Sequence, residues 1–136
     1  MTEPENITNG ERRKQVILVR KDLKMRRGKE IAQGSHASME FLVSSLRNSD
    51  QPQITELDAD TIRWINKGMP KICLRVNSEA QLLELHEAAR EQGLKSQLIK
   101  DSGRTEFGGV PTYTACAIGP NLACLIDRIT GELTPY

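Results

Sequence analysis

Cationic side chains are concentrated in one short stretch near the start of the chain. The ten residues Arg20–Lys29 contain six cations and a single acid, Asp22. The whole chain is nearly neutral, with 19 Lys and Arg against 18 Asp and Glu, so this cluster is a local excess of positive charge. Cations at the start of a helix oppose its dipole unless an anion is brought to them. The stretch therefore indicates an anion-binding surface, although a solvated basic turn is the simpler alternative.

A second set of polar side chains follows an apolar run later in the chain. Asp101 comes just after this run, and Thr105, Thr112 and Thr114 follow in the next loop and at the start of the next run. A carboxylate, lysines and hydroxyls near an anion-binding patch can orient a water and stabilise an oxyanion. Such a set suits hydrolysis of an activated ester. A tight turn with a structural ion pair and the β propensity of threonine are the alternative explanations.

Other chemistries lack the residues that they need. The two histidines are His36 and His86, and no cysteine has a catalytic motif around it, so a Ser-His-Asp or Cys-His site is not indicated. No metal-ligand set and no C-x-x-C pair is visible, so we expect no metal and no cofactor. Cys73, Cys116 and Cys124 lie in or beside apolar runs and are expected to be buried and inert.

Composition describes a globular chain of one domain. Of its 136 residues, 38% are hydrophobic and 27% are charged, and no apolar run approaches the length of a membrane span. Residues 1–14 are polar and lack the apolar core of a signal peptide, so we expect a disordered tail, a domain over 15–136 and a cytoplasmic protein. With a net charge of +1, any contact with nucleic acid must be made by a patch.

The elements that must position these groups can be read from apolar periodicity. Residues 15–19 form a short β-branched run that predicts a buried strand. After Gly28 a helical period leads to a polar break near Arg47, and it predicts a buried helix face made of Ile31, Ser35, Ser38, Leu42 and Leu46. The basic stretch thus lies between the end of a strand and the start of a helix, a common site for anionic ligands in α/β proteins.

In the rest of the chain, segments with the apolar spacing of a helix alternate with segments that have the spacing of a strand. Helices are predicted over 58–67, over 79–92 with Ser78 as N-cap, and over 122–129, and strands over 70–76, 95–99 and 112–119. The second strand alternates apolar and basic residues, as expected of a strand near an edge. His86 is interpreted as a surface or boundary histidine. The order predicts an α/β layer fold with helices on both faces of the sheet.

Two separated motifs resemble one family. The first comprises Val16–Met25 with Gly28–Lys29, Ala32–Gln33 and Ser35–Ala37, and the second comprises Asp101-x-Gly103-Arg104-Thr105, Thr112-x-Thr114 and Ala117–Pro120. Both are similar to the signatures of type II peptidyl-tRNA hydrolases, and two multi-residue motifs in register are a specific signal. The sequence departs from the family pattern at Arg26–Arg27, Gly34 and Pro111.

The resemblance implies a fold and an activity. The fold would be a mixed four-stranded sheet flanked by helices, commonly in a homodimer. The activity would be hydrolysis, without a cofactor, of the ester between a peptide and the terminal ribose of tRNA. By position, the resemblance implies catalytic roles for Lys29, Asp101, Thr105 and Thr114. The residues expected to bind tRNA are Lys21, Lys24, Arg26, Arg27, His36 and Arg104.

Two further functions remain open at this point. The basic patch could serve a non-catalytic RNA-binding module, or a protein-interaction domain regulated through its basic loop. Phosphate binding alone has no use for a carboxylate such as Asp101. The aromatic residues are one Trp, two Tyr and two Phe, and they are scattered along the chain. The sequence therefore shows no cluster for stacking bases, which weakens sequence-specific reading of RNA.

The basic stretch generates a prediction about salt. We expect Lys21, Lys24, Arg26 and Arg27 to contact tRNA phosphates. Replacing two of them by Gln should weaken tRNA binding and flatten its dependence on salt concentration, by about one unit of log–log slope for each lost contact. Titrations of tRNA binding at several salt concentrations measure this slope, and an unchanged slope would mean that the RNA binds elsewhere.

Overall fold

The computed structural model describes residues 11–47, 57–104 and 106–136, with eight helices and strands. Their order is β1 (Arg13–Arg20), α1 (Arg27–Leu46), α2 (Ala59–Asn66), β2 (Lys71–Val76), α3 (Glu79–Glu91), β3 (Ser96–Asp101), β4 (Thr112–Leu122) and α4 (Ala123–Thr130). This order is the predicted one. β1 begins at Arg13, before the expected start of the domain at residue 15, and the rest of the expected disordered tail, residues 1–10, lies outside the described residues.

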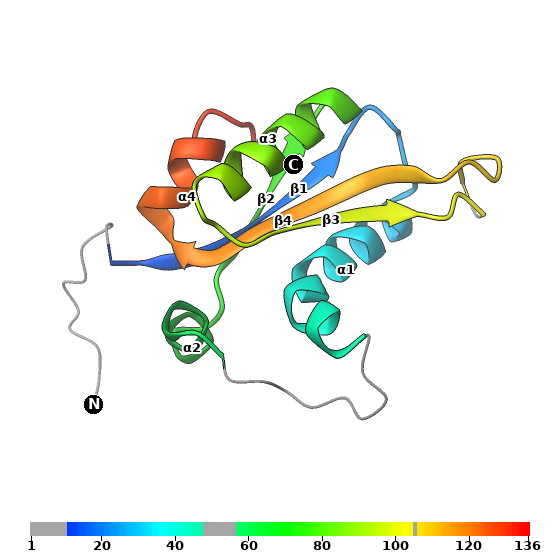
Figure 1. Cartoon of the computed structure of the whole chain (residues 1–136). Coiled ribbons are helices and arrows are strands. Elements are labelled where there is room, and N and C mark those ends of the chain that lie inside the picture. The colour runs from blue at the N-terminus through cyan, green and yellow to red at the C-terminus, as the bar shows by residue number, and fades with distance from the viewer. Residues whose placement is uncertain (1–10, 48–56, 105) are drawn as a thin grey trace.

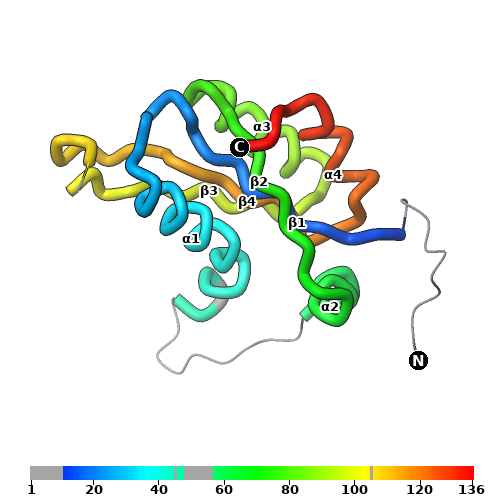
Figure 2. Tube along the Cα trace, turned by 180° about the vertical axis from the view of Figure 1, so that it is seen from behind, coloured from blue at the N-terminus to red at the C-terminus, as the bar shows by residue number. Residues whose placement is uncertain are grey.

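The four strands form one mixed sheet in the order β2-β1-β4-β3. β1 and β2 are parallel, whereas β4 is antiparallel to both of its neighbours, β1 and β3. β1, β2 and β3 therefore end at the same edge of the sheet, where β4 begins. β2 is an edge strand, as its alternating pattern predicted. Figures 1 and 2 show the β1–α1 loop and the β3–β4 loop at this common edge.

Two apolar clusters fill the two sides of the sheet. α3 and α4 cover one face, where Leu82 and Ile126 pack on Val16 and Leu18 of β1 (Figure 1). α1 and α2 lie on the other face, where Ala37 of α1 packs with residues of β1, β3 and β4. Helices thus cover both faces, and the predicted α/β fold with a mixed four-stranded sheet is confirmed.

The predicted buried face of α1 is wrong at Ile31 and Ser35, whereas Ser38, Leu42 and Leu46 are half-buried. Ile31 is 64% exposed and Ser35 is also exposed, whereas Gln33, Gly34, Ala37 and Glu40 are buried against the rest of the protein. The large apolar residues dominate the periodicity, but small residues let the helix backbone approach the sheet. A Cβ added at Gly34 would lie 3.7 Å from the Ile17 side chain, which shows how close α1 comes to β1.

The expectation of three buried cysteines is also wrong for two of them. Cys116 is buried, but Cys73 and Cys124 are exposed. The side chain of Cys73 lies on the side of β2 that is turned toward α1. Cys124 lies on the exposed side of α4. Burial raises the pKa of the Cys116 thiol to about 11, so this thiol stays protonated near neutral pH.

His86 is a boundary histidine, as predicted, and its ring is anchored. The Ser96 hydroxyl lies 2.7 Å from His86 Nδ1 and 3.2 Å from the Cys116 sulfur. Burial, and next the positive charge of Arg90, lower the pKa of His86, with a smaller opposing effect of Glu87. The fold therefore favours the neutral imidazole.

This lowered pKa gives a prediction about pH. Between the folded pKa and the unfolded value of about 6.5, the unfolded chain binds more protons at His86 than the folded chain does. The contribution of His86 to the free energy of unfolding is therefore complete above about pH 6.5 and is lost as the pH falls below it. Urea denaturation at pH 5.5 and 7.5 should show a smaller pH effect in His86→Gln than in the unaltered protein. An equal pH effect in the two proteins would contradict the prediction.

Candidate active site

The site is built where α1 begins and β3 ends. Lys29 lies in the first turn of α1, and Asp101 is the last residue of β3. The Lys29 ammonium donates to Asp101 Oδ1 at 2.9 Å, and the two side chains are only 15% and 13% exposed. These residues are 72 positions apart in the sequence. The structure brings them together, but β4 lies between β1 and β3, and α1 crosses under it to reach Asp101.

Both oxygens of Asp101 accept hydrogen bonds. Oδ2 accepts from the backbone N–H of Gly103 at 2.8 Å. Gly103 has φ +83°, and a Cβ there would come within 2.1 Å of the Val110 carbonyl oxygen, so only glycine fits this turn. The bond from Lys29 lowers the pKa of Asp101 below its ordinary value, against the raising effect of burial and with help from Gly103. Asp101 is therefore a carboxylate over the whole neutral range.

The β3–β4 loop also reaches the start of α1. Arg26, the N-cap residue of this helix, makes no side-chain capping bond. Instead, the Arg26 backbone N–H donates to Glu106 at 3.3 Å, and the Arg26 Nε lies 3.8 Å from the same carboxylate. A carboxylate near a helix N-terminus is favoured by the dipole. The loop thus contacts the helix that carries Lys29 on its first turn.

Thr114 is fully buried beside this pair. Its hydroxyl donates to the Oε1 of Gln33, one turn of α1 after Lys29, so Thr114 contacts the helix rather than an open cleft. The sequence motif includes Gln33 but predicts no role for it. A polar residue on the sheet-facing side of α1 was the available signal, but the helix face had been assigned wrongly. Thr105 lies outside the described residues.

The expected tRNA-binding residues lie on the segments next to the pair. Lys21, Lys24, Arg26, Arg27 and Arg104 are exposed, on the β1–α1 loop, the start of α1 and the β3–β4 loop. Lys24 has φ +52°, in the left-handed region, where the loop turns toward α1.

His36 lies two turns along α1 from Lys29. Its Nε2 is 3.3 Å from Glu40 Oε2, and its charge helps to lower the pKa of Asp101. Of the expected tRNA-binding residues, His36 is thus one whose interaction with Asp101 is seen directly.

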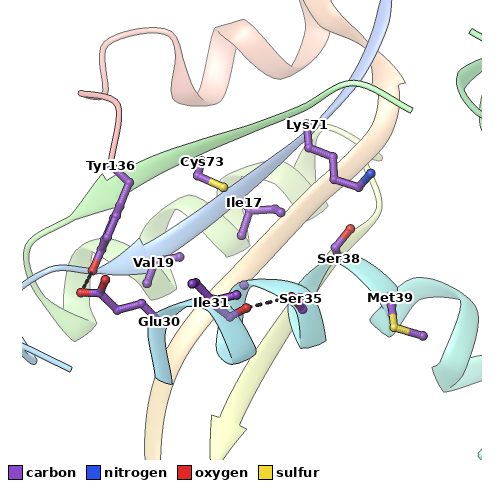
Figure 3. A pocket seen from close by; sticks show the side chains of 11 residues that line it. Ile17, Val19, Glu30, Ile31, Ser35, Ser38, Met39, Lys71, Cys73 and Tyr136 are labelled. Carbon is purple, nitrogen blue, oxygen red and sulfur yellow. Dashed lines mark hydrogen bonds between the residues drawn. The ribbon is translucent and has the colours of Figure 1, made fainter. Parts of the chain in front are cut away.

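An apolar groove lies on the other side of α1. It encloses about 470 Å³ between α1 and the strands β1 and β2, and its lining includes Ile17, Ile31, Met39, Cys73 and Tyr136 (Figure 3). Lys29 faces β3 across the helix from this groove. The groove and the ion pair are therefore two separate features.

The described residues contain no group of three His, Cys, Asp or Glu side chains that could hold a metal ion. Within the same residues, no helix is long and apolar enough to cross a membrane.

Comparison with known proteins matches the sequence of this chain to one family. The family model described as "Peptidyl-tRNA hydrolase PTH2" matches residues 13–136. Relatives named peptidyl-tRNA hydrolase include a protein of Aeropyrum pernix, 42% identical over 127 residues, which are 91% of this chain and 96% of the relative. Another, from Methanopyrus kandleri, is 41% identical over 120 residues, 88% of this chain and 95% of the relative. A third, from Methanocaldococcus jannaschii, is 38% identical over 120 residues, 88% of this chain and 96% of the relative.

The match begins with β1 and runs through Tyr136, so it includes the basic loop, the Lys29–Asp101 pair and all four strands. The resemblance drawn from the two sequence motifs is confirmed, and the chain belongs to the peptidyl-tRNA hydrolase PTH2 family.

Proposed function

We propose that this member of the peptidyl-tRNA hydrolase family cleaves the ester between peptide and tRNA at the pair formed by Lys29 and Asp101. The observation that carries the proposal is the 2.9 Å contact between these two side chains, next to two loops that carry exposed cations. The products are a free peptide, or an N-blocked amino acid, and a tRNA that can be used again in translation. Because its substrate arises in translation, we expect the protein to act in the cytoplasm.

Lys29 stabilises the charge that develops on the substrate. Attack of water on the ester carbonyl gives a tetrahedral oxyanion, which a preorganised ammonium can stabilise. An ammonium carries three N–H groups, so its bond to Asp101 is compatible with another to the oxyanion. The small exposure of both side chains strengthens this electrostatic effect, because little water screens it.

Asp101 orients the attacking water and holds Lys29. A general base works best with a pKa near the operating pH, and the pKa of Asp101 is shifted in the opposite direction. Orientation of the water is therefore its main role. As the new C–O bond forms, the water proton passes to Asp101 and from there to the departing ribose oxygen, so the carboxylate ends as it began. Thr105 and Thr114 are proposed to assist as hydroxyl groups of the same site, Thr114 through its bond to Gln33.

The tRNA backbone is held by the surrounding cations. Lys21, Lys24, Arg26, Arg27, His36 and Arg104 are proposed to contact phosphates and to bring the 3′ end of the tRNA to the pair. A non-catalytic RNA-binding module is less consistent with this geometry. A carboxylate that is only 13% exposed, next to a basic surface, does not help to bind phosphates, and it is better explained by a part in the chemistry.

We also propose that the protein is a homodimer. Family resemblance supports this, and so do exposed large apolar side chains around the groove beside α1. Ile31 and Met39 of α1 are 64% and 58% exposed, and Ile62 and Ile65 of α2 lie on the same side of the sheet. Apolar side chains grouped on one face are typical of an interface. A second copy of the chain is the proposed occupant of this face.

The catalytic proposal predicts the effects of two substitutions. Asp101→Asn keeps the size of the side chain and removes its charge, so turnover of N-blocked aminoacyl-tRNA should fall by a factor on the order of a hundred or more. Binding of tRNA should survive or tighten, because a negative charge has left the cleft. Lys29→Met should damage both turnover and binding.

Because Lys29 and Asp101 are proposed to act as a unit, their effects on turnover should not be additive in a double variant. The loss in Lys29→Met/Asp101→Asn should be smaller than the two single losses multiplied together. Single-turnover rates and tRNA binding, measured on folded protein, test both predictions. Normal turnover by Asp101→Asn would exclude the role given to Asp101, and intact substrate at high concentrations of unaltered enzyme would exclude the function.

The proposed homodimer predicts that substitutions in its interface lower the mass of the protein in solution. Sedimentation equilibrium of the unaltered protein should give twice the mass of the chain, and Ile31→Asp with Met39→Asp should give a monomer, because a buried charge is costly at an interface. Ile72→Asp is the matched control. Ile72 is also exposed, at 42%, but its partner in the sheet is Val16, on the opposite face. A monomeric unaltered protein, or a double variant that remains a dimer, would contradict the proposal.

A further inference from the structure

A short segment after α4 extends the sheet at the outer edge of β2. The Arg75 backbone N–H donates to the Thr134 carbonyl at 2.9 Å, Leu74 forms an antiparallel bridge with Pro135, and the Tyr136 N–H donates to the Cys73 carbonyl at 2.9 Å. These bonds fix the backbone of Tyr136 to the sheet. Figures 1 and 2 show this end of the chain lying against β2.

The Tyr136 side chain reaches across to the first turn of α1. Its hydroxyl donates to Glu30 Oε1 at 2.5 Å, and Figure 3 shows the ring pointing from the β2 edge toward this carboxylate. Burial, and next the bond to Glu30, raise the pKa of Tyr136 well above its ordinary value. The phenol is therefore protonated at any working pH and remains a donor.

The ring of the same tyrosine holds the other end of the basic loop. Lys21 Nζ lies 4.4 Å from the centroid of this ring, within the range of a cation–π contact. Lys21 follows directly after β1, and Glu30 lies in the first turn of α1. Tyr136 thus contacts both ends of the loop that carries the proposed phosphate-binding cations.

The neighbour of Glu30 is Lys29. The N-cap of α1 makes no side-chain capping bond, and contacts from other elements hold the first turn of this helix. Among them are those of Glu106 with Arg26, Asp101 with Lys29 and Tyr136 with Glu30. We propose that Tyr136 is a positioning residue for this reaction: it fixes the first turn of α1 through Glu30 and so aims Lys29 at Asp101, while its ring orders Lys21. This inference rests on the proposed function for its link to turnover, and on the contacts alone for its link to Lys29.

Two substitutions separate the roles of the hydroxyl and the ring. Tyr136→Phe removes only the donor, so kcat should fall roughly three- to tenfold while KM for tRNA substrate stays unchanged. This is less than the full effect of one lost hydrogen bond to a charged group, because the bond acts on Lys29 only indirectly. Tyr136→Leu also removes the ring over Lys21, so KM should rise as well. Glu30→Ala removes the acceptor and should lower kcat as Tyr136→Phe does, and the double variant should lose no more than the larger single loss.

A readout independent of turnover tests the positioning itself. The carboxyl carbon of Asp101 can be titrated by NMR, and its pKa should move up toward the ordinary value in Tyr136→Phe, because a displaced Lys29 no longer lowers it. Tyr113→Phe is the matched control, since Tyr113 is the other of the two tyrosines and packs on the opposite side of the sheet. It should retain the kcat and the Asp101 pKa of the unaltered protein.

The outcomes separate the two proposals. A folded Tyr136→Phe with unchanged kcat and unchanged Asp101 pKa would overturn the positioning role, as would equal effects of Tyr113→Phe. If the unaltered protein does not cleave the ester, the proposed function fails, but a shift of the Asp101 pKa in Tyr136→Phe would still support the link from Tyr136 to Lys29. Should Tyr136→Phe fail to fold, Glu30→Ala tests the same hydrogen bond from its other end.

Discussion

The geometry of the site depends on the ion pair between Lys29 and Asp101. Removing two charges from water is costly, and their attraction offsets this cost only when the geometry is good and the remaining polar atoms are satisfied. Here both carboxylate oxygens accept hydrogen bonds, one from Lys29 and one from Gly103. Such a pair adds little to stability, so its presence at the common end of the strands is better explained by chemistry. It also requires α1 to lie close to the sheet, which Gly34 and Ala37 permit.

Much of the fold could be predicted from the sequence because its local signals agree with its tertiary structure. Ser78 was expected to begin a helix, and its side chain does accept a bond from the backbone N–H of Gln81. The alternating pattern of β2 correctly indicated an edge. α1 was assigned the wrong buried face because apolar size was used as the criterion. Its large residues instead border an open groove, and Glu40 is buried on the sheet side with Arg47 and His36 as partners.

The candidate site was predictable only where a local motif carried it. Lys29 and Asp101 stand in the two motifs, and the structure brings them into contact although β4 lies between β1 and β3. Gln33 contacts Thr114, 81 positions away in the sequence, and Tyr136 contacts Glu30, 106 positions away. No local pattern contains such contacts. They follow from the register of the sheet and from the edge pairing of residues 134–136, which only the three-dimensional structure supplies.

The central position of β4 also has a consequence for how the protein folds during synthesis. β3 pairs with β4 and with no other strand of the sheet that the structure describes, so Asp101 cannot dock beside α1 until residues 112–122 have left the ribosome. Until then β1 and β2 can pair with each other. This half of the sheet is joined to α1, which carries Lys29, but it does not include Asp101. Such non-local pairing makes assembly slow relative to the local helices. A nascent chain therefore acquires its complete site only after β4 has emerged, so a copy that lacks β4 cannot present the paired groups to the tRNAs around it.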